Sequence, residues 1–329
     1  MVDLPLYVLT TTRCNFVCRY CFEEGIPQSD MLPTIKDKMI SFIEGIVVSK
    51  GISSINLTLF GGEPLMTGMS PEVAKDIKEV AVSRSTDYHL SLITNGYLLS
   101  PTTLEKLVGL GLDKVIVSID GSEKQHNRNR PLKNGDPTFD MIVDNVEAVL
   151  PVVPVVIRVN YYPGEIAEVI KGLKRIKEMG ANSVYFSPIR PSSEKSCGEV
   201  PASKNDFDEL VILHKSAKEM GLLPHDDYRF GPCMAHHPHA MVINPSGEIY
   251  KCLYGVGRSF CRSGSIFDGY KPNQRIVQKE YMSDKCHLCE LLPFCFGGCR
   301  YDAYQSTGSF EGTVCKKGGL GRLRKIKKM

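Results

Sequence analysis

The chain has 329 residues, of which 42% are hydrophobic and 23% charged, and its formal net charge is +3. This composition is typical of a globular protein and excludes a disordered chain, and the small net charge argues against a nucleic-acid-binding surface. The sequence holds no signal-peptide pattern and no run of about 18 apolar residues, so we expect a cytoplasmic protein that binds neither membrane nor nucleic acid.

Apolar, β-branched runs alternate with segments of helical periodicity up to about residue 220. The sequence predicts six strands, at 6–10, 55–60, 89–94, 114–119, 154–161 and 183–187. It predicts six helices, near 34–50, 71–84, 101–110, 138–149, 164–179 and 203–220. Six strand–helix units predict an α/β fold in which a parallel sheet curves into an incomplete, TIM-like (β/α)6 barrel, with the chemistry at the carboxyl ends of the strands.

The alternation ends near residue 222, after which Cys, Gly and Pro become frequent. Two short apolar runs, 240–243 and 248–251, flank an Asn-Pro-Ser-Gly turn and predict a β-hairpin. The sequence thus predicts a barrel, a cysteine-rich domain and a basic tail, which cover 1–222, 223–318 and 319–329. We expect the tail to be solvated and flexible, because its basic residues are interspersed with glycines.

Three cysteines, Cys14, Cys18 and Cys21, follow the first predicted strand. Twelve cysteines in a chain expected to be cytoplasmic favour metal ligation over disulfides. Three thiolates are one short of the set of four cysteines that closes an iron–sulfur cubane, so one iron would stay open for a substrate or cofactor. A zinc site is the alternative, but structural zinc usually takes four ligands and no nearby histidine supplies the fourth.

This CxxxCxxC loop, with the aromatic Tyr20 before its last cysteine, resembles the radical S-adenosylmethionine (SAM) superfamily over about residues 4–220. The resemblance implies that the amino and carboxylate groups of SAM bind the open iron of a [4Fe–4S] cluster. It further implies that one electron cleaves SAM to methionine and a 5′-deoxyadenosyl radical, which abstracts hydrogen from the substrate.

Segments at the ends of later strands resemble the SAM-binding positions of that family. Gly61-Gly62-Glu63-Pro64 matches the GGEP motif, whose carbonyls and carboxylate receive the SAM ammonium. The remaining SAM positions, implied for the ribose, the carboxylate and the adenine, are Thr94, Asn95, Ser118, Asp120, Arg130 and Ser187. Arginine suits a carboxylate partner because its guanidinium binds in a bidentate way. Taken alone, each segment is also compatible with an ordinary turn or an exposed salt bridge.

Seven further cysteines have a spacing that resembles the SPASM domain, an extension found in radical SAM enzymes that act on peptides and proteins; the match covers about residues 226–318. The resemblance implies two auxiliary [4Fe–4S] clusters, three clusters in all, with interleaved ligands. Auxiliary cluster I would take Cys233, Cys252 and Cys299, and auxiliary cluster II would take Cys286, Cys289, Cys295 and Cys315. A double zinc ribbon is the alternative for the second set.

The sequence does not identify the fourth ligand of auxiliary cluster I. Several relatives have a cysteine where this chain has Asp227. Asp227 could bind through oxygen, Cys261 or Cys197 could take the position, or the iron could stay open, and we favour an open or non-cysteine site. The catalytic acid or base is not identified by the sequence; Asp227 and Tyr228 are candidates because they lie near this cluster in the chain.

The resemblance indicates a radical SAM peptide maturase that abstracts hydrogen from a ribosomally made peptide and installs a thioether or carbon–carbon cross-link. An anaerobic sulfatase-maturing, formylglycine-generating enzyme is an alternative. That branch carries a base after the Gly-x4-Cys cysteine and commonly a Gln before GGEP, where this chain has Leu253 and Phe60. An iron–sulfur electron carrier or scaffold is the alternative from another class.

The expected partners are a peptide or protein substrate and an electron donor such as flavodoxin or ferredoxin. Thirteen residues precede Cys14, too few for a leader-peptide-binding domain. We therefore expect recognition by the two domains, by the basic tail or through a separate leader-binding protein.

Overall fold

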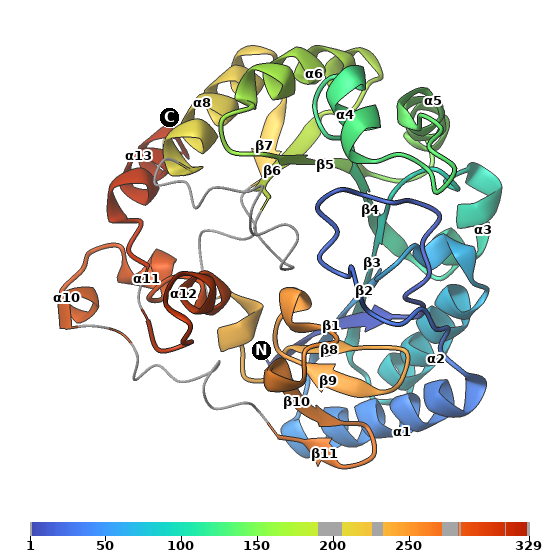
Figure 1. Cartoon of the computed structure of the whole chain (residues 1–329). Helices are drawn as coiled ribbons and strands as arrows, with labels where there is room; N and C mark the ends of the chain where they lie inside the picture. Colours follow the sequence, from blue (N-terminus) through green and yellow to red (C-terminus); the bar gives the residue numbers. More distant parts are fainter. Residues whose placement is uncertain are drawn as a thin grey trace.

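The structure is a computed structural model that describes residues 2–189, 206–225, 233–271, 282, 284–312 and 314–327. Within these residues a single sheet of eleven strands runs in the order β11-β10-β9-β8-β1-β2-β3-β4-β5-β6-β7. The strands β1 to β7 form an arc with helices on its outer side, and the C-terminal elements lie across its open side (Figure 1). The predicted α/β fold with an incomplete barrel is confirmed.

The first seven strands are parallel and adjacent in chain order. They are β1 (Asp3–Leu9), β2 (Ser54–Phe60), β3 (Asp87–Thr94), β4 (Leu112–Ser118), β5 (Val155–Tyr161), β6 (Ser183–Pro188) and β7 (Leu223–His225). All six predicted strands are present, and their carboxyl ends meet at one edge of the sheet. The short β7 extends this parallel arrangement to the place where we expected the domain boundary, which stays a prediction.

The crossover helices also agree with the sequence pattern. They are α1 (Pro33–Lys50), α2 (Met69–Ser83), α3 (Pro101–Gly109), α5 (Phe139–Val149), α6 (Ile166–Glu178) and α8 (Asp206–Glu219). Helix α3 begins where Ser100 accepts a hydrogen bond from the backbone of Thr103 at 3.1 Å, and Pro101 follows at a position that needs no donor. Helix α6 buries Val169, Leu173 and Ile176 against the sheet, which is the spacing of one helical face. A short helix α4 (Glu123–Asn129) was not predicted.

The cysteine-rich region joins the barrel through the sheet. The predicted hairpin is present as β8 (Met241–Ile243) and β9 (Glu248–Tyr250), and β8 runs parallel to β1 with Met241 opposite Leu6. The remaining elements are η2 (Met234–His236), η3 (Leu253–Gly255), η4 (Ser259–Cys261), β10 (Arg262–Ser265), β11 (Gly269–Tyr270), α10 (Asp284–His287), α11 (Leu292–Cys295), α12 (Arg300–Thr307) and α13 (Lys317–Lys327). Backbone pairing therefore fixes the hairpin, which leads directly to Cys252, against the first strand of the barrel.

The basic C-terminal segment is a helix, so our expectation of a flexible tail is wrong. Helix α13 packs against α8, as Figure 1 shows, and it buries Leu320 and Leu323. Gly319 allows this contact, because a Cβ at that position would lie 1.9 Å from the Cβ of Phe207. Tertiary packing thus stabilises a sequence of low intrinsic helix propensity. In the described part of the chain, no helix has both the length and the apolar character required to cross a membrane.

Candidate active site

The loop between β1 and α1 carries Cys14, Cys18 and Cys21 at the carboxyl end of the barrel. Its backbone is fixed by two hydrogen bonds, from Val17 N to Pro131 O and from Arg19 N to Asn129 O, both at 3.0 Å. Burial raises the pKa of the Cys18 thiol to about 11 and, with the neighbouring Cys18, that of Cys21 to about 12. Three half-buried thiols that influence one another electrostatically form a donor set that gains from exchanging its protons for a cationic iron–sulfur cluster.

A three-cysteine cubane fits this loop by the chemistry of its donors. In the part of the chain that the structure describes, no three His, Cys, Asp or Glu side chains converge as ligands of a single metal ion would. A cubane does not require such convergence, because each of its cysteines binds a different iron.

The Gly-Gly-Glu-Pro turn after β2 folds directly onto the cysteine loop. Gly62 has φ +47°, and a Cβ there would lie 2.1 Å from the carbonyl oxygen of Arg13. The Gly62 amide donates to Glu23 Oε2 at 2.8 Å, and the Glu63 amide donates to Arg13 O at 2.8 Å. Only glycine allows this approach of two backbones, so the turn and the cluster loop form one cradle.

Glu63 lies in this cradle with its side chain fully buried. Its carboxylate accepts hydrogen bonds from Thr94 Oγ1 and from the Asn95 amide, both at 2.7 Å, and from the Leu65 amide at 3.0 Å. Burial raises the pKa of Glu63, whereas these donors favour its charged form. Asn95 Nδ2 in turn donates to Asn15 Oδ1 at 2.8 Å on the cysteine loop. A buried, oriented carboxylate beside the cluster loop is a suitable partner for an ammonium group.

A second polar group lies at the ends of β4 and β5. The Tyr20 hydroxyl donates to the Asp120 carboxylate and accepts from Arg130 Nη1 at 2.7 Å. Asn160 Nδ2 donates to Asp120 Oδ1 at 3.1 Å. Among the described residues, no group accepts a hydrogen bond from the buried Nε of Arg130. Arg130 therefore retains a buried donor that suits a carboxylate ligand.

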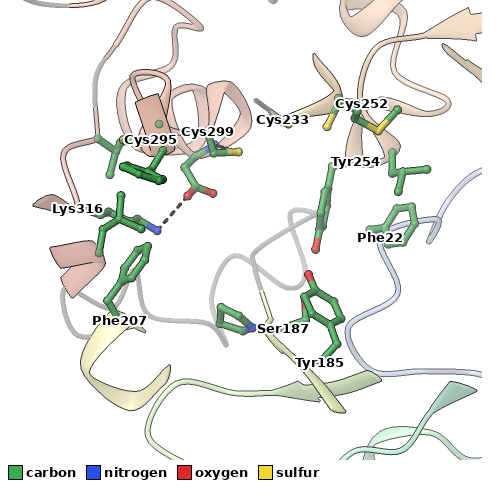
Figure 2. A pocket seen from close by; sticks show the side chains of 18 of the residues that line it. Phe22, Tyr185, Ser187, Phe207, Cys233, Cys252, Tyr254, Cys295, Cys299 and Lys316 are labelled. Atoms are coloured by element: carbon green, nitrogen blue, oxygen red, sulfur yellow. Dashed lines mark hydrogen bonds and ion pairs between the residues drawn. The ribbon is translucent and has the colours of Figure 1, made fainter. Parts of the chain in front are cut away.

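A cavity at the carboxyl ends of the strands separates the barrel from the cysteine-rich region. On the barrel side it is lined by Arg158, Tyr185 and Ser187, and Ser187 accepts a hydrogen bond from Arg158 Nη2 at 3.4 Å. The opposite wall carries Cys233, Cys252, Cys295 and Cys299 (Figure 2). The cavity also reaches the radical SAM motifs, since Phe22 follows Cys21 and Phe60 precedes Gly61. All three cysteines expected in auxiliary cluster I therefore border this cavity. We call it the substrate cavity below.

A second cavity holds the other cysteine set. Its lining includes Cys286, Cys289, Cys295 and Cys315. These are the four cysteines expected in auxiliary cluster II, although Cys315 is far from the others in the sequence. Cys295 borders both cavities.

The structure brings together most, but not all, of the residues predicted from the sequence. Ser118 is buried at the end of β4, opposite Arg158 in the sheet. Asp227, Tyr228 and Cys197 lie outside the described residues. Sequence reasoning missed Glu23, which holds the Gly62 amide, although its position two residues after Cys21 is a usable signal.

The comparison with known families agrees with this site. The family model of the radical SAM superfamily matches residues 8–173, about half of the chain. The matched region includes the cysteine loop, the Gly-Gly-Glu-Pro turn, Asp120 and Arg130. The chain therefore belongs to the radical SAM superfamily, whose members use a [4Fe–4S] cluster and SAM.

Two curated relatives carry different names. GTP 3',8-cyclase of Synechococcus sp. (strain CC9902) is 28% identical over 223 residues, which cover 66% of this chain and 54% of that protein. AdoMet-dependent heme synthase of Methanosarcina barkeri (strain Fusaro / DSM 804) is 26% identical over an alignment of 341 positions, which covers 91% of this chain and 92% of that protein. The match with the first of these proteins thus spans about half the length of that cyclase. A second GTP 3',8-cyclase, of Rippkaea orientalis, is matched over 36% of its length.

Solved structures resemble the whole chain. The protein described as "Native anSMEcpe with bound AdoMet and Cp18Cys peptide" has a TM-score of 0.78 at 18% identity and covers 100% of this chain and 97% of its own. Streptococcus suis SuiB bound to precursor peptide SuiA has a TM-score of 0.71 at 15% identity. The match covers 96% of this chain and 76% of SuiB. The shared fold extends through the cysteine-rich region, in agreement with a radical SAM barrel followed by a SPASM domain.

Proposed function

We propose that this radical SAM enzyme oxidises a ribosomally made peptide, abstracting hydrogen from it and leaving a thioether or carbon–carbon cross-link. The observation that carries this proposal is the position of the substrate cavity. It adjoins the cysteine loop through Phe22, and Cys233, Cys252 and Cys299 line its opposite wall. A substrate there lies between a radical source and a second set of iron ligands, which suits two successive one-electron oxidations.

Each part of the site has a task in this proposal. Cys14, Cys18 and Cys21 hold the first cluster, Glu63 receives the SAM ammonium and Arg130 pairs with its carboxylate. SAM bound in this way supplies the 5′-deoxyadenosyl radical. The buried Glu63 supports an enzyme rather than a simple electron carrier, because a carrier has no use for a carboxylate oriented beside its cluster.

The cavity walls support a peptide substrate. The lining includes six aromatic side chains, namely Phe22, Phe60, Tyr185, Phe207, Tyr254 and Phe294. Among the described lining residues, the charged groups are Arg158 and the ion pair of Lys316 with Asp302 at 3.0 Å. These largely apolar described walls suit an aliphatic or aromatic side chain. The peptides bound to anSMEcpe and SuiB agree with this class of partner.

Further partners follow from the same chemistry. Reduction of the first cluster requires an electron donor such as flavodoxin or ferredoxin, and a separate leader-binding protein could deliver the peptide. The sulfatase-maturing alternative gains no base from Leu253, which is an apolar, buried part of the cavity wall.

The experiment uses the anaerobically reconstituted enzyme, SAM, dithionite and a synthetic peptide for each small open reading frame found beside its gene. We expect a peptide product that has lost two hydrogens, with the cross-linked residues located by tandem mass spectrometry. Formation of 5′-deoxyadenosine with no change in any such peptide would contradict the proposal.

A second candidate is an oxidation in heme formation, because the relative named AdoMet-dependent heme synthase matches along 91% of the chain. In that case an iron porphyrin should bind the substrate cavity, and its Soret band should shift on titration with enzyme. Replacing Arg158 with Met should abolish that shift, because Arg158 is the cation on the barrel side of the cavity.

A further inference from the structure

Four aromatic rings form a continuous stack beside the substrate cavity. The ring centroids of Phe60 and Phe22 are 5.9 Å apart with an interplanar angle of 6°. Those of Phe22 and Tyr254 are 5.1 Å apart, and those of Tyr254 and Tyr301 are 5.2 Å apart. These are the separations of favourable ring contacts, so we call Phe60, Phe22, Tyr254 and Tyr301 the aromatic stack.

The ends of the aromatic stack coincide with the two proposed redox sites. Phe22 directly follows Cys21, and Phe60 directly precedes the Gly61-Gly62 turn. In the other half of the stack, the inner Tyr254 lies two residues after Cys252, and the terminal Tyr301 lies two residues after Cys299. The stack therefore joins the first cluster loop to two loops that supply auxiliary cluster I.

Tyr254 occupies the centre of the stack in a fixed position. It lies on the short turn η3, whose last residue, Gly255, packs so closely that a Cβ there would lie 2.7 Å from Cys261 Cβ. The Tyr254 carbonyl accepts a hydrogen bond from Arg258 Nη1, and the same guanidinium lies 6.0 Å from the centre of the Tyr301 ring. These contacts hold Tyr254 and Tyr301 together.

The phenol of Tyr254 also forms part of the substrate cavity. In Figure 2 its hydroxyl end points across the cavity toward that of Tyr185, while its backbone lies beside Cys252. Tyr301, by contrast, is buried, and its hydroxyl accepts from Gln305 Nε2 at 3.0 Å. Tyr254 is thus the member of the stack that faces both a substrate and the auxiliary cluster cysteines.

We propose that Tyr254 connects the substrate radical to auxiliary cluster I, and that the electron released as the new bond closes crosses its ring. This inference rests on the proposed function. In that step the substrate radical loses one electron and one proton as the bond forms. The electron would pass to an oxidised cluster held by Cys233, Cys252 and Cys299, the proton would leave to a base or solvent, and Tyr254 would be unchanged.

The physical basis is that electron tunnelling weakens more steeply across a gap than through packed atoms. A leucine at position 254 would leave a void between Phe22 and Tyr301, whereas a phenylalanine would preserve the ring contacts. Comparing the two substitutions therefore distinguishes the contribution of the aromatic ring from that of the hydroxyl group.

The first test compares Tyr254→Leu with Tyr254→Phe in the reconstituted enzyme, after iron content and thermal unfolding have been measured. We expect Tyr254→Leu to keep 5′-deoxyadenosine formation but to yield several-fold less product per 5′-deoxyadenosine, because the radical is formed and then not oxidised. Tyr254→Phe should restore the ratio of the native chain. An unchanged ratio in Tyr254→Leu would overturn the proposal.

A second readout needs neither substrate nor turnover. The chain contains no tryptophan, so Tyr254→Trp introduces a single fluorescent reporter. Its emission should be strongly quenched when the clusters are reconstituted, since quenching requires proximity to iron. Phe267→Trp, at an exposed position between β10 and β11, is the matched control and should be quenched much less. Equal quenching at both positions would contradict the proposal. If only the proposed function were wrong, the emission of Tyr254→Trp would still be quenched more than that of Phe267→Trp.

Discussion

Cys233 and Cys299 line the same cavity, although Cys286, Cys289 and Cys295 lie between them in the sequence. This arrangement agrees with interleaved ligands for the two auxiliary clusters. Burial, followed by the nearby thiols of Cys233 and Cys299 and more weakly that of Cys261, raises the pKa of Cys252, so Cys252 lies near both Cys233 and Cys299. We therefore predict that Cys299 binds with the first auxiliary set rather than with its neighbours in the chain.

The consequence can be tested by substituting one cysteine from each set. Cys299→Ala leaves two thiolates and should remove about four irons per chain and the EPR signal of auxiliary cluster I. Cys289→Ala leaves three thiolates and should shift the EPR signal of auxiliary cluster II. Both variants should still form 5′-deoxyadenosine. Cys261→Ala tests the fourth site of auxiliary cluster I, for which we favour an open or non-cysteine ligand, and should retain all the iron. Loss of the same signal in both cluster variants would disprove the interleaved assignment.

Glu63→Gln should weaken SAM binding without unfolding the chain. The amide oxygen can still accept from Thr94 and Leu65, but the acceptor for the Asn95 amide and the negative charge beside the proposed ammonium are lost. A charge-assisted hydrogen bond is worth about 1.5–3 kcal/mol, so the Kd should rise about 10- to 100-fold. Equilibrium dialysis with labelled SAM measures this change. Glu72→Gln, on helix α2, is the control, and equal affinity in both variants would refute the role of Glu63.

Lys251 holds together the segment between Cys233 and Cys252. Its buried Nζ donates to the carbonyl oxygens of His237 at 2.6 Å, Pro238 at 3.1 Å and Ala240 at 2.9 Å. Burial lowers the pKa of Lys251 to about 8, while the three acceptors favour its charged form.

We predict that Lys251→Met lowers the free energy of unfolding by about 3 kcal/mol, because three carbonyl groups, of which that of Ala240 is buried, lose a buried charged donor. Anaerobic denaturant titration followed by circular dichroism measures the change. Lys271→Met, at an exposed lysine, should have a small effect. Equal stability of the two variants would show that Lys251 contributes little.

Glu23 gives the chain a defined pH dependence. Burial raises the pKa of its carboxyl group from 4.5 to about 7, although the Gly62 amide opposes this shift. Between these two values the folded state binds more protons than the unfolded state, so the contribution of Glu23 to stability falls as the pH rises through this window.

As the pH rises from about 4.5 to about 7, the free energy of unfolding of Glu23→Gln should therefore fall less than that of the native chain. The amide oxygen can still accept from Gly62, so the turn should be retained. Thermal unfolding at several pH values measures the difference, and Glu24→Gln is the control for the change in net charge. Parallel stability curves for the native chain and Glu23→Gln would contradict the assignment.

The sequence was sufficient for the barrel because its signals are local. The alternating apolar pattern located β2 and β5 to within one residue, and the Ser100-Pro101 pair predicted the start of α3. The cysteine loop and the Gly-Gly-Glu-Pro turn were found because each is a short motif at a strand end.

Long-range contacts explain what the sequence did not provide. Helix α13 was missed because Gly319 indicates flexibility until Phe207 is known to lie against it. The aromatic stack was missed for the same reason, since Phe22, Tyr254 and Tyr301 are separated in the chain and meet only in the fold. Packing between distant segments, rather than local propensity, therefore builds the wall of the substrate cavity.

Formation of 5′-deoxyadenosine tests the central claim most directly, because only a SAM-cleaving cluster on Cys14, Cys18 and Cys21 accounts for it. The reconstituted chain is incubated anaerobically with SAM and dithionite, and the nucleoside is quantified by liquid chromatography. We predict that the native chain forms it and that Cys18→Ala, with both auxiliary clusters retained, does not. No 5′-deoxyadenosine from a fully loaded native chain, or as much from Cys18→Ala, would contradict the account.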